Sequence, residues 1–188
     1  MRVPLAPEPS SRPWLGTGVV LSAALLGLTA CSTAPAHEDT PVDPSPSIDS
    51  AQAEAVLETY RSAREVYIDL LQGELDMDTA DEQLKQYATG QAYDSMLQDG
   101  TTFGEADIAF EGEPGMDPQV TGLDMDSDPP SSVLTDCWDD SSWHPVQNGQ
   151  TLEAAPDQDP RRVLNVRAQQ QDGAWVLVEL SPEEGRTC

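Results

Sequence analysis

A short apolar run that ends in a cysteine divides this chain into segments with different fates. The run extends over residues 14–30, follows Arg2 and Arg12, and is succeeded directly by Cys31. It is short for a membrane span, and glycines interrupt it, whereas its basic, apolar and small-residue regions are typical of a signal peptide. The motif Leu28-Thr-Ala-Cys31 has the form of a lipobox, in which the cysteine receives a diacylglyceryl group and becomes the first mature residue.

This motif predicts a chain of three parts. Residues 1–30 are expected to form a lipoprotein signal peptide, and Cys31 is the predicted lipidation site. Residues 31–47 are rich in proline and have too little apolar surface to offset ordering, so they are expected to be a disordered tether. Residues 48–188 then form one domain of ordinary size. The acyl chains would hold the protein on the extracytoplasmic face of the cell membrane. An uncleaved anchor and an ordinary secretory signal are the alternatives.

The charge of the chain restricts its partners. The sequence has 34 acidic residues against 9 lysines and arginines, a formal net charge of −25. Nucleic acid is excluded as a partner, because phosphate binding needs clustered Lys and Arg. A basic patch for anionic lipid is absent for the same reason. Arg161, Arg162 and Arg167 are expected to neutralise neighbouring acids; receiving an anionic ligand is the alternative.

The first part of the domain has helical periodicity. Apolar residues three and four apart predict a helix over residues 48–72 that ends at Gly73. Shorter helices are expected over residues 79–87 and 91–99, the latter ending at Gly100.

The pattern then changes to period two with turn residues, which predicts strands. The strands are expected over residues 103–111, 119–125, 131–139, 143–146, 151–154, 162–171 and 174–180. Helices followed by a meander of strands indicate an α+β fold, in which the amino-terminal helices pack on a curved antiparallel sheet.

Two segments of this layout resemble a known family. The order of helices and strands, the segment Thr135-Asp-Cys-Trp-Asp-Asp-Ser141, and the strand at Gly173-Ala-Trp175 before a terminal cysteine resemble secreted actinobacterial lipoproteins of the nuclear transport factor 2-like superfamily. The resemblance covers residues 48–188 and implies a cone of helices on a curved sheet. That superfamily includes enzymes, binding modules and assembly domains, so the resemblance assigns no chemistry. Such domains often pair through the open sheet face, which here implies a homodimer through Trp175 and Leu177.

The cysteines are expected to have two roles. With Cys31 assigned to the lipid, Cys137 and Cys188 remain, and two cysteines left over outside the cytoplasm usually pair. A disulfide would join the carboxyl terminus to a central strand. Intermolecular pairing and free thiols are the alternatives.

Acidic residues suggest two further sites, and neither is complete. Asp136, Asp139, Asp140 and His144 surround Cys137, and a buried aspartate there would serve as a general base in a cone-fold enzyme. A solvated acidic turn is the alternative interpretation. The segment Asp124-Met-Asp-Ser-Asp128 begins like a calcium loop, but the required glycine and bidentate glutamate are missing.

A ligand pocket is the remaining candidate site. Trp138, Trp175 and Asp136 would line it inside the cone, unless the tryptophans are simply core residues. The sequence therefore predicts a lipid-anchored binding or interaction lipoprotein that has no catalytic residues, cofactor or metal and whose protein or small-molecule partner is unknown. A small-molecule enzyme using a buried Asp and a weak calcium-binding envelope protein are the alternatives.

Overall fold

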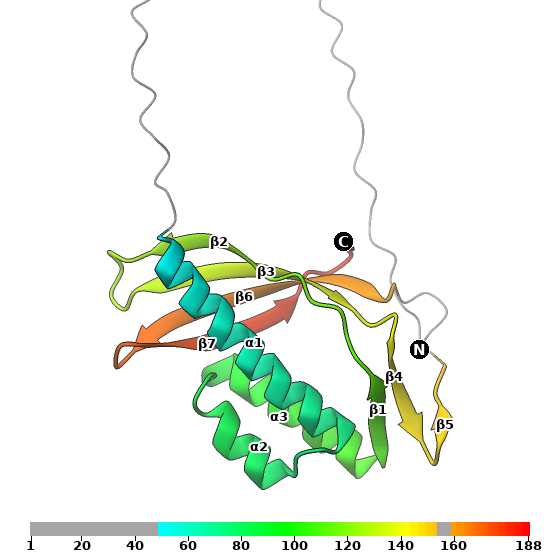
Figure 1. Ribbon diagram of the computed structural model, residues 1–188. Coiled ribbons are helices and arrows are strands. Elements are labelled where there is room, and N and C mark those ends of the chain that lie inside the picture. Colours follow the sequence, from blue (N-terminus) through cyan, green and yellow to red (C-terminus); the bar gives the residue numbers. More distant parts are fainter. Residues whose placement is uncertain (1–48, 154–158) are drawn as a thin grey trace, which may run out of the picture. The chain divides into compact units, whose positions relative to one another are not determined.

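The computed structural model describes residues 49–153 and 159–188, which belong to one compact unit of the chain (Figure 1). The predicted signal peptide, the lipidation site Cys31 and the predicted tether lie outside the described residues. Among the helices of the described ranges, none is long and apolar enough to cross a membrane.

Three helices open the domain: α1 (Ser50–Gln72), α2 (Met77–Leu84) and α3 (Gly90–Glu105). The expected first helix is confirmed. The Asp49 carboxylate caps it by accepting hydrogen bonds from the amides of Ala51 and Gln52, at 2.9 and 3.1 Å. Gly73 ends it in the left-handed conformation, with φ 77°, which glycine adopts without a Cβ clash.

The third helix is longer than expected, because Gly100 does not end it. Gly100 is buried inside α3, where a Cβ atom would stand 2.5 Å from Cδ2 of Leu70 on α1. The missing side chain therefore lets the two helices approach each other, and the helix continues to Glu105. The strand expected from residue 103 consequently begins only at Ile108.

The strands form two antiparallel sheets. They are β1 (Ile108–Gly112), β2 (Gln119–Asp124), β3 (Ser131–Asp139), β4 (Trp143–Gln147), β5 (Gln150–Thr151), β6 (Arg161–Gln171) and β7 (Ala174–Pro182). One sheet has the order β2-β3-β6-β7, and the other has the order β1-β4-β5. The predicted α+β class is confirmed: three helices lie with two antiparallel sheets (Figure 1).

The alternation along the strands decides which side chains enter the core. On β3, Leu134, Asp136 and Trp138 are buried, whereas Val133 on the opposite face is 44% exposed. β3 pairs with β6 along its whole length, so Leu134 lies opposite Val166. The side chains of both strands on this face pack against the helices in one hydrophobic core.

The expected dimer contact is not on an open face. Trp175 is 5% exposed and Leu177 is fully buried, and both belong to the core. The amide and carbonyl of Leu177 also bond to Tyr87 and Thr89, at the turn before α3. The homodimer interface predicted at these two residues is therefore wrong. Homodimerisation through another surface stays a prediction.

The predicted disulfide is present in the structure. Cys137 on β3 is bonded to Cys188, which is 51 positions further along the sequence, with 5.8 Å between their Cα atoms. The chain after β7 also bonds to the start of β6, since the amide of Glu183 donates to the carbonyl of Val163 at 2.8 Å. The carboxyl terminus is thus fixed to the sheet by one covalent bond and by backbone pairing.

Candidate functional site

The three residues predicted to line a pocket are core residues. Asp136, Trp138 and Trp175 are 1%, 0% and 5% exposed. Trp138 packs edge-on against Trp143, with 5.5 Å between the ring centroids. The two cavities described below are lined by other residues. The residues expected to line a pocket are thus packed in the core, and they line neither of those two cavities.

Asp136 lies at the centre of a buried hydrogen-bond network. Its carboxylate accepts the phenolic hydrogen of Tyr60 at 2.5 Å and the backbone amide of Asp117 at 2.6 Å. Burial raises the pKa of Asp136, and the two hydrogen bonds partly oppose that shift. Burial raises the pKa of Tyr60 as well. This network joins α1 to β3. Asp136 is only 1% exposed, so its carboxylate is not accessible to a substrate.

Arg64 is a buried charge that the sequence interpretation missed. Its guanidinium carbon lies 3.8 Å from the ring centroid of Trp138 and 4.4 Å from that of Tyr67. Among the described residues it makes no ion pair within 4.0 Å, and its Nε has no hydrogen-bond partner. The two aromatic faces therefore stabilise the charge through cation–π contacts. The available signal was its spacing, four residues after Tyr60 and three before Tyr67 in the apolar stripe.

The acids around Cys137 do not converge. Asp140 accepts hydrogen bonds from Nε1 of Trp138 and from Arg162, both at 2.5 Å. Asp139 lies at the end of β3, where its carboxylate accepts the amide of Ser141 at 2.8 Å. His144 is exposed on β4. These residues, separated from the buried Asp136, form no acid–base cluster.

The arginines of β6 are ion-paired, as the sequence predicts. The pairs are Arg161 with Asp139 at 3.6 Å, Arg162 with Asp140 at 2.5 Å and Arg167 with Glu179 at 3.0 Å.

The calcium-like segment forms a turn. The Asp124 carboxylate accepts the backbone amides of Asp126 and Ser127, at 3.0 and 3.1 Å. This is the Asx turn that short acidic loops commonly adopt. Among the described residues, no group of three or more His, Cys, Asp or Glu side chains is placed to hold a metal ion.

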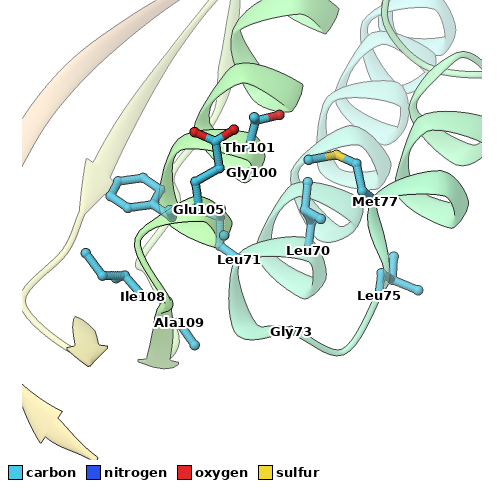
Figure 2. Close-up of a pocket in the computed structure, with 12 residues that line it drawn as sticks. Leu70, Leu71, Gly73, Leu75, Met77, Gly100, Thr101, Glu105, Ile108 and Ala109 are labelled. Atoms are coloured by element: carbon cyan, nitrogen blue, oxygen red, sulfur yellow. The ribbon is translucent and has the colours of Figure 1, made fainter. Parts of the chain in front are cut away.

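An apolar groove of about 440 Å³ is the feature best suited to binding. It lies where the end of α1, the start of α2, the end of α3 and the start of β1 meet (Figure 2). Its walls are mostly half-buried or exposed, so it opens to solvent. The lining residues are Leu70, Leu71, Gly73, Leu75, Met77, Gly100, Thr101, Phe103, Gly104, Glu105, Ile108 and Ala109.

Two glycines leave part of this groove empty. Gly73 and Gly104 contribute no side chains, and a Cβ atom built on either would meet nothing within 4 Å, whereas the space beside Gly100 is taken by Leu70 and Met77. The reversal after Gly73 then brings Leu75 and Met77 to one side of the groove, beside Leu70 (Figure 2). The sequence interpretation missed the site, because it treated Gly100 as a helix end. The signal was the pair of glycines four residues apart, within residues that continue as a helix.

A second cavity of about 280 Å³ is smaller and more polar. Its lining residues are Lys85, Ala88, Thr89, Tyr93, Gln171 and Val176. Lys85 is paired with Asp81 at 2.5 Å, and Asp81 also accepts the hydroxyl hydrogen of Tyr93. These polar groups already satisfy one another, so the apolar groove is the stronger candidate.

Comparisons with known proteins assign no family. No protein-family model and no curated protein matches the chain. Among solved structures, the intermembrane space region of the chloroplast protein ARC6 is similar with a TM-score of 0.43 and 11% identity, over 73% of this chain and 98% of that one. A de novo designed β-sheet protein is similar with a TM-score of 0.38 and 15% identity, over 70% of this chain and 92% of that one. Likenesses this distant support no argument about function.

Proposed function

We propose that this protein is a lipid-anchored binding lipoprotein of the extracytoplasmic membrane face that contacts its partner through the apolar groove. The supporting observation is the contrast between a filled interior and an open groove at one end of the helices. Contiguous apolar surface that folding leaves accessible commonly marks an interaction site. The lipobox ending at Cys31 supports the anchor, and the acidic, proline-rich residues after it suit a tether.

Membership of the nuclear transport factor 2-like superfamily is part of this proposal. Its support is the layout of three helices on antiparallel strands, together with the segment Thr135-Asp-Cys-Trp-Asp-Asp-Ser141 and the terminal cysteine. Superfamily members without an open interior would use their outer surfaces, which is consistent with the filled core around Trp138.

The enzyme alternative is less well supported than binding. A general base must come within hydrogen-bond reach of a substrate proton, and both oxygens of Asp136 are already bonded to Tyr60 and Asp117. The calcium alternative is likewise weaker, because the Asp124 carboxylate is engaged by the amides of its own turn.

Site-specific photocrosslinking in living cells tests the binding function. A benzophenone amino acid is placed at Leu75, on the groove, and in a second variant at Thr135, on the outer face of β3. Both are introduced into the full-length chain in its own host. Thr135 is the matched control, since it is half-buried like Leu75 and is not among the residues that line the groove.

The proposal predicts a discrete crosslinked product from Leu75 that the Thr135 variant does not give. Adding Met77→Lys, which places a charge in the groove, should remove that product while the chain remains folded and present at the same level. The same products from both positions, or none from Leu75, would count against binding through the groove.

A further inference from the structure

The charged residues around the groove are almost all acidic. Residues 65–109, which supply every wall of the groove, include eleven acids and a single base, Lys85. Lys85 is committed to Asp81 by an ion pair at 2.5 Å. The remaining bases of the described residues lie elsewhere, at Arg61 and Arg64 on α1, Arg161, Arg162 and Arg167 on β6, and Arg186 after β7.

Several of these acids line the groove or are next in sequence to residues that line it. Glu105 lines the groove, and Glu74, Asp76 and Asp107 are immediate neighbours of lining residues. All four are exposed. Apart from Asp76, whose carboxylate caps α2 through Thr79, none of them has a hydrogen bond or ion pair from its side chain within the described chain. Their charges are therefore available to a ligand.

The open shape favours a polypeptide over a small molecule. Small-molecule sites bury most of the ligand and orient it by several convergent polar groups. In this groove Thr101, Gly104 and Ala109 are exposed, and only Thr101 and Glu105 offer polar side chains. An amphipathic helix needs no such enclosure, because its apolar face fills the groove and its polar face remains in water.

We infer that the groove binds a partner's polypeptide segment in which apolar side chains are flanked by Lys or Arg, as on a basic amphipathic helix. The apolar residues would pack against Leu70, Leu75 and Met77, and the basic residues would meet the acids that line or adjoin the groove. This inference rests on the proposed binding function and specifies its ligand. Electrostatic attraction of this kind accelerates association and rejects acidic competitors.

A direct binding measurement tests the inference. The full-length protein is held in phosphatidylcholine nanodiscs, whose lipid has no net charge, and binding to empty nanodiscs is subtracted. The probes are two Leu-faced helical peptides of about five turns. One has Lys on its polar face and the other has Glu, and each has a benzophenone group on the Leu face.

The Leu/Lys peptide should bind at least about tenfold more tightly than the Leu/Glu peptide, and its crosslinks should map to the groove residues. Raising NaCl from about 50 to about 500 mM should weaken the affinity for the Leu/Lys peptide several-fold, because salt screens exposed charges. Glu105→Gln with Asp107→Asn should reduce both the affinity and the salt dependence. Leu75→Lys should abolish groove labelling, whereas Val133→Lys on the outer sheet face should change nothing.

Other outcomes overturn the inference. Equal affinity for the two peptides, labelling outside the groove, or an in-cell Leu75 product that is a second copy of this chain would each do so. If Leu75 crosslinks a partner in cells but the Leu/Lys peptide does not bind, the proposed function stands and only the ligand class is wrong. If Leu75 gives no product in cells either, both fail.

Discussion

Tyr60 on α1 donates a hydrogen bond to Asp136 on β3 at 2.5 Å, and both side chains are sealed from solvent. The bond crosses the core between residues that are 76 positions apart in sequence. Since the other carboxylate oxygen accepts the Asp117 amide, the buried acid is satisfied on both sides. A polar network of this kind stabilises a fold only while each member keeps its partner.

Removing one member of the pair should therefore destabilise the protein. Tyr60→Phe should reduce the free energy of unfolding by about 1.5–3 kcal/mol, the range for hydrogen bonds to charged groups. Asp136→Ala should cost more, about 3–5 kcal/mol, because the Tyr60 hydroxyl and the Asp117 amide both lose their acceptor. Urea unfolding of the two single variants and the double variant measures the coupling. Strict additivity would contradict a direct bond.

The buried tyrosines should make the fold sensitive to alkali. Burial raises the pKa of Tyr60 and of Tyr67, so each phenol keeps its proton in the folded state above the pH where the unfolded chain loses it. Their contribution to stability is fully present below the unfolded pKa of about 10 and is lost as the pH rises beyond it.

The decrease in the free energy of unfolding with rising pH can be measured as a slope. Each tyrosine should lower the free energy of unfolding by about 1.4 kcal/mol per pH unit above its unfolded pKa. Tyr60→Phe should remove one such contribution between pH values of about 10 and 11.5, as measured by urea unfolding at each pH. If Tyr60→Phe leaves the pH dependence of the free energy of unfolding unchanged, the contribution assigned to buried Tyr60 is contradicted.

Gly100 and Gly104 should respond oppositely to the same substitution. A Cβ atom at Gly100 would lie 2.5 Å from Cδ2 of Leu70 and 3.2 Å from Cε of Met77. Gly100→Ala should therefore destabilise the protein by about 1–3 kcal/mol through overpacking, despite the better helix propensity of alanine. Gly104→Ala, which meets nothing within 4 Å, should be stabilising by about 0.5–1 kcal/mol. Thermal unfolding of the two variants measures the change in melting temperature. Equal changes would contradict the close packing of Leu70 against Gly100.

The disulfide should contribute more to the free energy of unfolding than the single hydrogen bond between Tyr60 and Asp136. A bridge between residues 51 positions apart stabilises by about 4 kcal/mol in the chain-entropy description. Cys188→Ser and Cys137→Ser should lose similar amounts, and the double variant should lose no more than either. The free energy of unfolding of the wild-type protein under reducing conditions should match that of the variants. If reductant leaves wild-type stability unchanged, the bond is not formed.

Periodicity was sufficient to predict α1 and the long strands. The stripe from Val56 to Leu71 and the alternation of Leu164, Val166 and Ala168 correspond to the buried faces of α1 and β6. Pattern alone does not reveal a residue's neighbours, which explains the errors. Gly100 ends a helix in isolation, but here Leu70 occupies the place of its missing side chain.

The site was harder to predict for a related reason. Alternation correctly placed Trp138 and Asp136 on the inner face of β3, but it does not distinguish a pocket wall from a filled core. The filling depends on Trp143 and Arg64, which approach from β4 and α1. The groove depends on a long-range junction of helix ends, and the local pattern offers only the glycine pair in α3 as a sign of it.

The proposed lipid anchor at Cys31 is central, because the proposed location, the proposed tether and the expected oxidising surroundings of Cys137 and Cys188 all depend on it. Metabolic labelling with an alkyne-bearing palmitate, followed by mass spectrometry of the amino-terminal peptide, tests it most directly. The account predicts label on the wild-type protein, a mature chain that begins at acylated Cys31, and no label on Cys31→Ala. Equal labelling of both proteins, or a wild-type chain that retains residues 1–30 without acylation, would contradict it.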